Sequence, residues 1–274
     1  EKKLMSYGND FVLTLFTNDP DLAQAANDAG INRIGLDLEK IGKEHRQDAS
    51  KAWISDHQAH EIQAIRQRLT RSALFTRTNP IHDKSYDEIN YLLNQGVNVL
   101  MLPMFRTVKE AATFIELVQG RAQVSLLVET AAAAMRLREI IQLSGIDEIH
   151  VGLNDLYLDM KLSNHFEMLT SGLVDMLADI VLSAGIPFGF AGIGRINDHR
   201  LPIPADLIYA QYPRLGATRA LVSRVFYTPD FRTLDLSNEV KAARAALDRW
   251  HLSGIEQQMD ALTLLRAKVT QWTV

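Results

Sequence analysis

The chain has 274 residues, of which 47% are hydrophobic and 23% are charged, and its formal net charge is -4. This composition suits a globular protein with a full core, and it argues against a nucleic-acid partner because no run of Lys or Arg stands out. The absence of Cys excludes disulfides, thiolate metal ligands and a Cys nucleophile, and it fits a reducing compartment. The first apolar run, residues 11–16, is too short for a signal peptide or a membrane span, so we expect a cytoplasmic protein without a membrane partner.

Short apolar, β-rich runs alternate with longer amphipathic runs along the chain. The short runs predict eight strands, at residues 11–16, 33–37, 72–77, 98–102, 123–128, 147–152, 187–191 and 219–225. The longer runs predict intervening helices at residues 19–29, 56–69, 85–94, 107–118, 130–143, 166–184 and 203–215. Two more helices are predicted after the last strand, near 237–250 and 254–270.

Two of the predicted helices carry clear end signals. Asp19 is a suitable N-cap, with Pro20 at the first helical position and Gly30 as the C-cap. Ser85 is followed three residues later by Glu88, which predicts a capping box at the start of the helix 85–94.

Strands joined by helical crossovers fit either a closed barrel or an open doubly wound sheet. No Gly-rich phosphate loop follows the first strand, where a nucleotide-binding sheet carries one. Strand number and length favour a TIM (β/α)₈ barrel, which we expect to form one domain over residues 1–274, with additional C-terminal helices at 237–270. In such a barrel the active site lies at the C-terminal ends of the strands.

Acidic side chains follow two adjacent strands of the predicted barrel. Glu129 ends the fifth strand, and Asp155 follows the sixth. Acids on one rim can share a hard cation such as Mg²⁺ or Mn²⁺ and leave positions open for water and a 2-oxo acid. Alternatively, each acid caps the helix that follows it.

Charged residues also follow the second and third strands. Arg77 ends the third strand and can hold a carboxylate or an enolate oxygen, or it can form a surface salt bridge. Asp37, Glu39 and Lys40 follow the second strand, as candidate catalytic groups or as part of a solvated loop. His45 lies just beyond and is a further candidate base.

Further candidates lie on the second half of the barrel. Backbone N–H groups around Gly152, Leu153 and Asn154 are candidates for binding a substrate carboxylate. Arg224, after the last strand, can hold an anionic group or form a salt bridge. The glycines of GFAGIGR (189–195) allow close approach to a ligand, although their spacing makes a weak nucleotide motif.

Three other histidines are interpreted as lying outside the site. His57 and His60 precede the third strand, so we expect them on the surface, away from the active rim. His150 lies inside the sixth strand and is interpreted as a packed residue.

Four segments carry a family resemblance: TRTNP (76–80), QGVNVLMLPM (95–104), LLVETAAAAMRLREI (126–140) and IHVGLNDLYLDM (149–160). They resemble the HpcH/HpaI aldolase and citrate lyase β family, over roughly residues 31–225. By position, Glu129 and Asp155 look like the family's metal ligands, and Arg77 looks like its catalytic arginine. LDLE (36–39) looks like the acidic motif after strand 2, and is closer to that of the citrate lyase branch.

The resemblance implies a Mg²⁺- or Mn²⁺-dependent carbon–carbon lyase or aldolase. Its substrate would be a small 2-oxo acid of the pyruvate or oxaloacetate type, which reacts through an enolate. The resemblance also implies a homo-oligomer, commonly with C-terminal helices packed on neighbouring subunits.

Three departures from the aldolase branch keep other functions open. Lys40 stands where that branch has a His, Leu127 stands where it has a Gln, and the stretch from Pro103 to Glu129 is short. One alternative is a citrate lyase β-like or citrate synthase-like enzyme that acts on a thioester. The other is a degenerate, non-catalytic barrel that serves as a binding domain.

Overall fold

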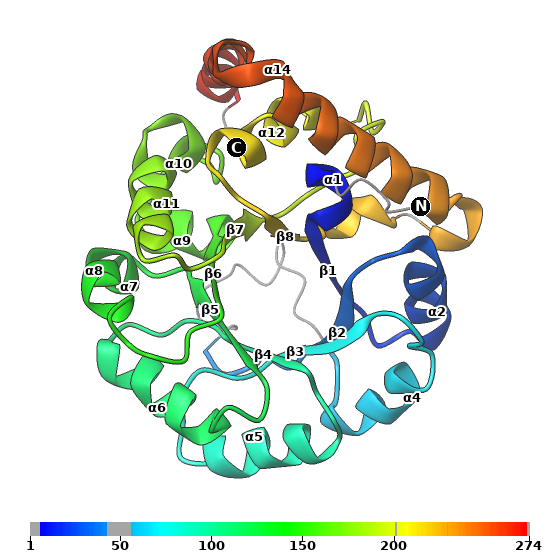
Figure 1. Ribbon diagram of the computed structural model, residues 1–274, viewed down its shortest axis with the longest axis vertical. Helices are drawn as coiled ribbons and strands as arrows, with labels where there is room; N and C mark the ends of the chain where they lie inside the picture. Colours follow the sequence, from blue (N-terminus) through cyan, green and yellow to red (C-terminus); the bar gives the residue numbers. More distant parts are fainter. Residues whose placement is uncertain (1–5, 43–55, 201, 229, 273–274) are drawn as a thin grey trace.

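The strands form a closed parallel barrel in the order in which they occur along the chain (Figure 1). The computed structural model describes residues 6–42, 56–200, 202–228 and 230–272. Within these residues the strands are β1 Val12–Phe16, β2 Arg33–Asp37, β3 Ala73–Arg77, β4 Val99–Leu102, β5 Gln123–Val128, β6 Glu148–Gly152, β7 Phe188–Ala191 and β8 Arg219–Leu221. The predicted TIM barrel is therefore confirmed, and only the last strand is clearly shorter than predicted.

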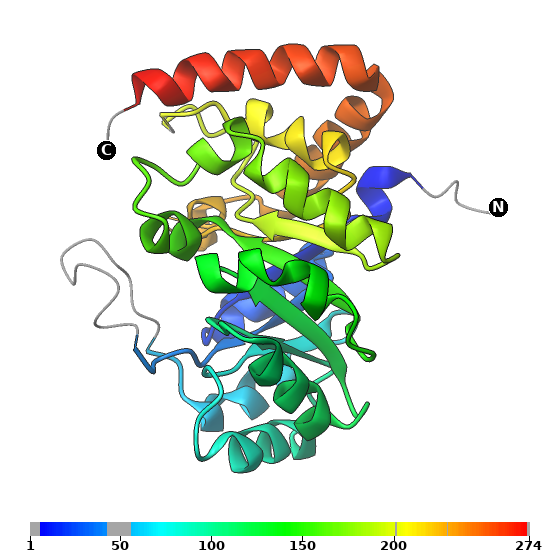
Figure 2. The same cartoon turned by 90° about the vertical axis from the view of Figure 1, so that its left-hand side faces the viewer.

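Helices surround the barrel on the outside (Figures 1 and 2). The predicted helices at 19–29, 85–94 and 107–118 are present, whereas four others are broken into shorter pieces, and α1 and α9 were not predicted. The described helices are α1 Tyr7–Asp10, α2 Pro20–Ala29, η1 Ala59–Glu61, α4 Ile62–Arg66, α5 Ser85–Asn94, α6 Val108–Val118, α7 Ala131–Met135, α8 Leu137–Ile140, α9 Leu153–Asp159, α10 Glu167–Thr170, α11 Leu173–Ser183, α12 Ala205–Tyr209, α13 Gln211–Arg214, η2 Arg224–Phe226, η3 Phe231–Thr233 and α14 Leu236–Gln271.

The predicted end signals of α2 are confirmed, whereas for α5 the predicted bounds are correct but the capping box is wrong. Asp19 accepts hydrogen bonds from the first turn of α2, and Gly30 closes the helix with a φ of 90°. At α5, Lys84 is the N-cap, and Ser85 Oγ instead accepts the N–H of His82 at 2.8 Å. Glu88 does not complete a capping box, because its carboxylate binds the loop that follows β3.

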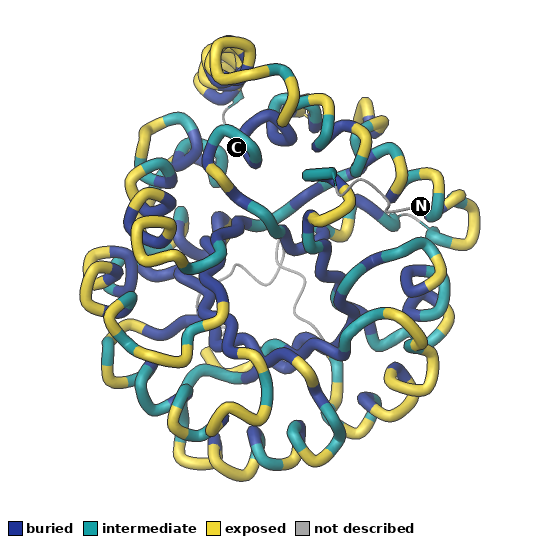
Figure 3. The backbone as a smooth tube through the Cα atoms, viewed as in Figure 1, coloured by how far each residue is buried: buried dark blue, intermediate teal, exposed yellow. Residues whose placement is uncertain are grey.

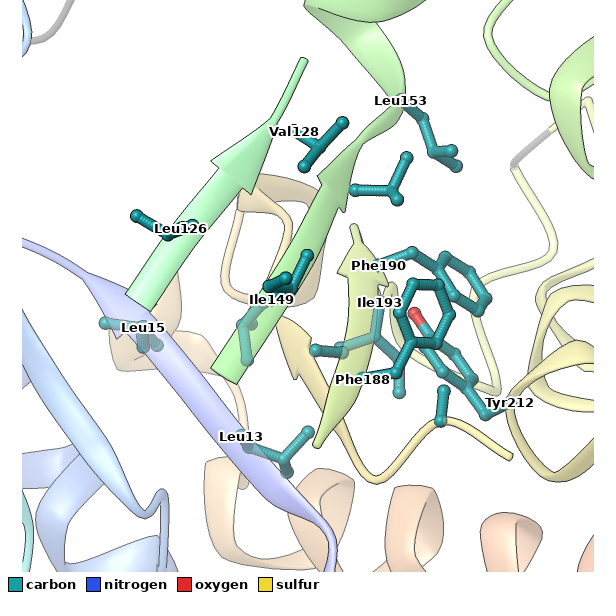
Figure 4. Close-up of a cluster of buried hydrophobic side chains, with 14 of the residues drawn as sticks. Leu13, Leu15, Leu126, Val128, Ile149, Leu153, Phe188, Phe190, Ile193 and Tyr212 are labelled. Atoms are coloured by element: carbon teal, nitrogen blue, oxygen red, sulfur yellow. The ribbon is translucent and has the colours of Figure 1, made fainter. Parts of the chain in front are cut away.

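Most of the barrel backbone belongs to buried residues (Figure 3). The hydrophobic core has two parts. The larger part fills the space between the strands and the surrounding helices, and it includes the stacked rings of Phe190 and Tyr212, whose centroids lie 4.1 Å apart (Figure 4). The smaller part lies inside the barrel, because its members alternate along the strands with those of the larger part: Phe75, Val99, Met101, Leu127 and Leu221.

A network of buried polar groups closes the barrel interior at the end where the strands begin, opposite the C-terminal ends of the strands. Arg33, Glu148 and Arg219 are each the first residue of a strand. Arg33 Nη1 donates to both oxygens of Glu148, at 2.7 and 2.8 Å, and Arg219 Nη1 binds the same carboxylate. His150 Nε2 lies 3.1 Å from Glu148 Oε1, which confirms that His150 is a packed residue. We call Arg33, Glu148, His150 and Arg219 the charged floor.

The long helix α14 bends at Gly254, whose φ of 81° and ψ of 168° are not helical. This bend separates the two helices predicted near 237–250 and 254–270. Within the chain, α14 packs against α1, α2, α10, α12 and α13 (Figure 2). Its packing on a neighbouring subunit stays a prediction. None of the described helices combines the length and apolar character needed to cross a membrane.

Candidate functional site

The ends of β2 and β3 place Asp37 beside Arg77. These two residues are partners in the parallel ladder, and their side chains meet in a two-pronged ion pair. Arg77 Nε donates to Asp37 Oδ1 at 2.8 Å, and Nη2 donates to Oδ2 at 2.7 Å. Nη2 also lies 3.3 Å from Glu39 Oε2. Three of the predicted site residues are therefore in direct contact.

Arg77 is held in a largely buried position. Its side chain is only 12% exposed, and its guanidinium carbon lies 5.4 Å from the centre of the Phe16 ring. Burial alone would lower the pKa of Arg77, but the charges of Asp37 and Glu39 outweigh it and raise the pKa well above its usual value. The interpretation of Arg77 as a surface salt bridge is therefore wrong.

Glu129 turns inward at the end of β5 and is only 2% exposed. Its Oε1 accepts the N–H of Met104 at 3.0 Å. Its Oε2 lies against Gly152, where an added Cβ would approach it to 2.7 Å. The N-cap of the following helix is Thr130, whose Oγ1 accepts the N–H of Ala133. Glu129 is therefore not a helix cap.

The acids on this rim interact with one another. Asp155 lies in the first turn of α9 and is 9% exposed. Burial raises the pKa of Glu129 well above its usual value, and the negative charges of Glu39 and Asp155 raise it further. The positive charge of Arg77 opposes this shift. Glu39, Asp155 and Arg77 are thus each within electrostatic range of Glu129.

The acid pair could accept a divalent cation as part of a larger ligand set. Among the described residues, no three or more His, Asp and Glu side chains converge on a point where they could hold an ion alone. Mg²⁺ commonly takes one or two carboxylates and fills its other positions with water and substrate. A cation would also relieve the repulsion between the buried carboxylates of Glu129 and Asp155. The donor set fits such an ion.

The other predicted residues vary in their relation to the site. Gly152 ends β6, and the N–H groups of Leu153 and Asn154 belong to the first turn of α9, although the Leu153 side chain is in the core and Asn154 is exposed. Lys40 is also exposed. Arg224 begins η2 after β8. The charges of Asp37 and Arg77 both act on its pKa, so it lies within electrostatic range of them. His45 lies outside the described residues.

Asn79 is a residue of the site region to which the sequence analysis assigned no role. Its Oδ1 accepts the N–H groups of Lys40 at 2.9 Å and of Ile41 at 3.1 Å. Its Nδ2 donates to Glu88 Oε1 at 3.1 Å. This side chain of the TRTNP segment therefore ties the loop after β2 to helix α5.

His57 corrects a second expectation. It is half-buried, and its Nδ1 accepts the N–H of Asp37 at 3.0 Å. The expectation that it lies away from the rim was wrong, because a helix that follows a barrel strand begins at the rim where that strand ends. His60, three residues later, is exposed as expected.

The glycine run GFAGIGR (189–195) begins inside β7 and is explained in part by packing. A Cβ on Gly189 would lie 2.4 Å from Arg219 Cγ and 2.5 Å from the Arg219 carbonyl oxygen. This glycine is therefore required inside the barrel beside the charged floor. Its role is in the interior, and not in close approach to a ligand.

The closed parallel barrel is that of a TIM-barrel protein. Its arginine and buried acids lie at the C-terminal ends of the strands, where such proteins carry their active sites. The chain belongs to the HpcH/HpaI aldolase/citrate lyase family, whose profile matches residues 11–192. This finding confirms the resemblance at the level of the family.

Two solved structures support the fold. An HpcH/HpaI aldolase from Desulfitobacterium hafniense DCB-2 is 14% identical, with a TM-score of 0.60, and the match covers 78% of this chain and 86% of the other. An HpcH/HpaI aldolase/citrate lyase family protein from Burkholderia cenocepacia J2315 is 16% identical, with a TM-score of 0.61 and coverage of 88% and 95%. A comparison with curated proteins gave no match.

Proposed function

We propose that the protein is a metal-dependent carbon–carbon lyase that acts on a small 2-oxo acid through an enolate. The observation that carries this proposal is the arrangement of Arg77, Glu129 and Asp155 at one rim, where the pKa of Glu129 responds to both of the other charges. Family membership supports the same reaction class.

In the proposed reaction, Glu129 and Asp155 hold Mg²⁺ or Mn²⁺. The ion supplies Lewis-acid polarisation of the substrate's 2-oxo group. Arg77 contributes a fixed positive charge, which stabilises the negative charge that develops on the enolate oxygen. The N–H groups of Leu153 and Asn154, at the start of α9, bind the substrate carboxylate.

Glu39 is the proton acceptor that we favour among the described candidates. Both carboxylate oxygens of Asp37 accept hydrogen bonds from Arg77, at 2.8 and 2.7 Å, whereas Glu39 Oε2 lies 3.3 Å from Arg77 Nη2, so Arg77 holds Asp37 more tightly than Glu39. Lys40 is exposed. Glu39 is fully buried, and its negative charge helps to raise the pKa of Glu129, so the two carboxylates are within electrostatic range of each other.

Proton exchange provides a test that does not require the second substrate. Pyruvate, oxaloacetate and 2-oxobutyrate are incubated separately with the protein and Mg²⁺ in D₂O, and loss of the C3 proton signal is followed by NMR. The wild type should exchange at least one of these acids. Glu129→Gln should lower the rate by about a hundredfold or more, because the several kcal/mol of Lewis-acid stabilisation is lost.

Glu116→Gln is the matched control, since Glu116 is an exposed acid on α6. It should exchange at the wild-type rate. Absence of exchange of all three acids by the wild type would overturn the proposal and leave a binding domain as the better interpretation. Exchange or cleavage of oxaloacetate that requires added acetyl-CoA would favour the thioester alternative.

A further inference from the structure

Both proposed metal ligands lie just beyond the hydrogen-bonded ladder that joins β5 and β6. The register of these strands runs as far as the pair Val128 and Val151. Glu129 directly follows the first of these residues, and Asp155 lies four positions after the second, in the first turn of α9. The ladder therefore brings the two strands together, but it does not by itself fix the separation of the two carboxylates.

A carboxylate at the far end of α9 joins the two segments beyond the ladder. Asp159 is the last residue of α9, and its Oδ2 accepts the N–H of Ala131 at 2.7 Å. Ala131 is the first residue of α7 and lies two positions after Glu129. Asp159 lies four positions after Asp155, which puts both acids on the same face of α9. One hydrogen bond thus connects the segment that carries Glu129 to the helix that carries Asp155.

The N–H of Ala131 needs an acceptor from outside its own helix, because it belongs to the first turn of α7. The N-cap residue Thr130 uses its Oγ1 to accept a different N–H, that of Ala133, at 3.1 Å. Thr130 Oγ1 also donates to the carbonyl of Phe105 at 2.8 Å, which holds this turn from the side of β4. Asp159 holds the same turn from the side of β6.

A second contact of Asp159 is weaker. Arg106 Nη1 lies 3.5 Å from Asp159 Oδ1, and the arginine side chain is 53% exposed. An exposed ion pair of this length contributes little, because water screens the charges. The short bond to Ala131 is therefore the contact through which Asp159 acts.

We propose that Asp159 is a positioning residue of the metal site, which sets the separation of the Glu129 and Asp155 carboxylates through its hydrogen bond to Ala131. This inference rests on the proposed function, because that function assigns the ion to these two acids. The separation matters since Mg²⁺ tolerates little departure from octahedral geometry. In this role Asp159 supports the two ligands through the backbone and does not bind the ion itself.

Mn²⁺ affinity, measured by isothermal titration calorimetry, tests this role without turnover. Asp159→Ala removes the acceptor and should weaken binding by about tenfold to a hundredfold, the usual effect of losing the support of a metal ligand. Asp159→Asn keeps an oxygen that can accept the Ala131 N–H, so it should remain within about threefold of the wild type. Equal weakening in both variants would mean that Asp159 acts through its charge, and would overturn the inference.

The donor side of the bond is tested with Ala131→Pro. Proline has no N–H to donate, and it is well tolerated at the first position of a helix. Thr130, with a φ of -124° and a ψ of 144°, already has the extended backbone that a following proline favours. This variant should lose as much Mn²⁺ affinity as Asp159→Ala, and the double variant should lose no more than either alone. Additive losses would contradict the inference.

Asp235→Ala is the matched control for a loss of stability. Asp235 caps α14 by accepting the N–H of Asn238 at 3.0 Å, so its removal also deletes an aspartate that satisfies a helix N–H. This variant should unfold at a lower urea concentration but keep the wild-type Mn²⁺ affinity. An equal loss of affinity in the control would make destabilisation the cause and overturn the inference.

The same titrations separate this inference from the proposed function. Circular dichroism confirms that each variant is folded before Mn²⁺ is added. Wild-type binding together with an unchanged affinity in Asp159→Ala would overturn the positioning role alone. A wild type that bound no Mn²⁺ would overturn the metal site of the proposed function, and this inference with it.

Discussion

Gly152 is the residue on which the position of the Glu129 carboxylate depends. A Cβ at this position would lie 2.7 Å from Glu129 Oε2 and 2.9 Å from Glu129 Cβ. The side chain of Glu129 is enclosed and accepts the Met104 N–H, so it cannot move away without losing that hydrogen bond. The glycine is thus needed for the space that it leaves.

Gly152→Ala should therefore weaken Mn²⁺ binding by about tenfold to a hundredfold, the usual effect of disturbing the support of a metal ligand. Isothermal titration calorimetry measures this affinity. Gly172→Ala is the control, because Gly172 has a φ of 84° and open space around it, away from the site. It should lower stability but leave Mn²⁺ affinity unchanged. Equal affinity in Gly152→Ala and wild type would contradict the prediction.

The individual site residues differ in how far the sequence predicted them. Glu129, Asp155 and Arg77 follow strands, and their rim position was expected because parallel strands of a barrel end on one side. His57 was missed because the start of its helical segment was expected to point away from the active rim. The bond from Asp37 to its ring joins residues twenty positions apart, and no local pattern signals it.

Helix α6 shows how local sequence defines an element. Thr107 Oγ1 accepts the N–H of Glu110 at 3.2 Å, and Glu110 Oε2 accepts the N–H of Thr107 at 2.8 Å. This reciprocal capping box satisfies two N–H groups at the helix start. At α5 the similar Ser85–Glu88 spacing does not cap, because Asn79 and His82 compete for the same side chains.

Thr107→Ala should lower the free energy of unfolding by about 1 kcal/mol, the typical cost of losing an N-cap. Urea denaturation measures this change. Thr263→Ala is the matched control, since Thr263 is exposed within α14 and its hydroxyl bonds back to the Met259 carbonyl. That change should be neutral or slightly stabilising, because Ala is the better helix former. An equal loss in both variants would rule out capping as the cause.

The charged floor links the stability of the whole barrel to pH. Burial alone would raise the pKa of Glu148, but the hydrogen bond from His150 and the charges of Arg33 and Arg219 hold it well below its usual value. In the unfolded chain this carboxyl titrates near its ordinary pKa of about 4.3. The native protein therefore binds fewer protons than the unfolded chain as the pH falls below that value.

The stability contributed by Glu148 should be complete above about pH 4.3 and should decline as the pH falls towards the native pKa of this carboxyl. Chemical denaturation between pH 7 and pH 3 measures this decline. Glu148→Gln should lose about 3–5 kcal/mol at pH 7, because the buried arginines lose their counter-ion, and its acid dependence should be shallower. An unchanged acid dependence in Glu148→Gln would exclude this carboxyl as its origin.

The sequence by itself determined the order of strands and helices. Apolar residues recur about every second position in a strand and about every third or fourth position in a helix, and these spacings can be read from neighbouring residues. It also indicated which side chains follow strand ends, since that depends on position along the chain. The ion pair of Arg77 with Asp37, the charged floor and the contact of His57 were decided only by the tertiary structure. They depend on closure of the barrel and on strand register, which bring together groups that are remote in sequence.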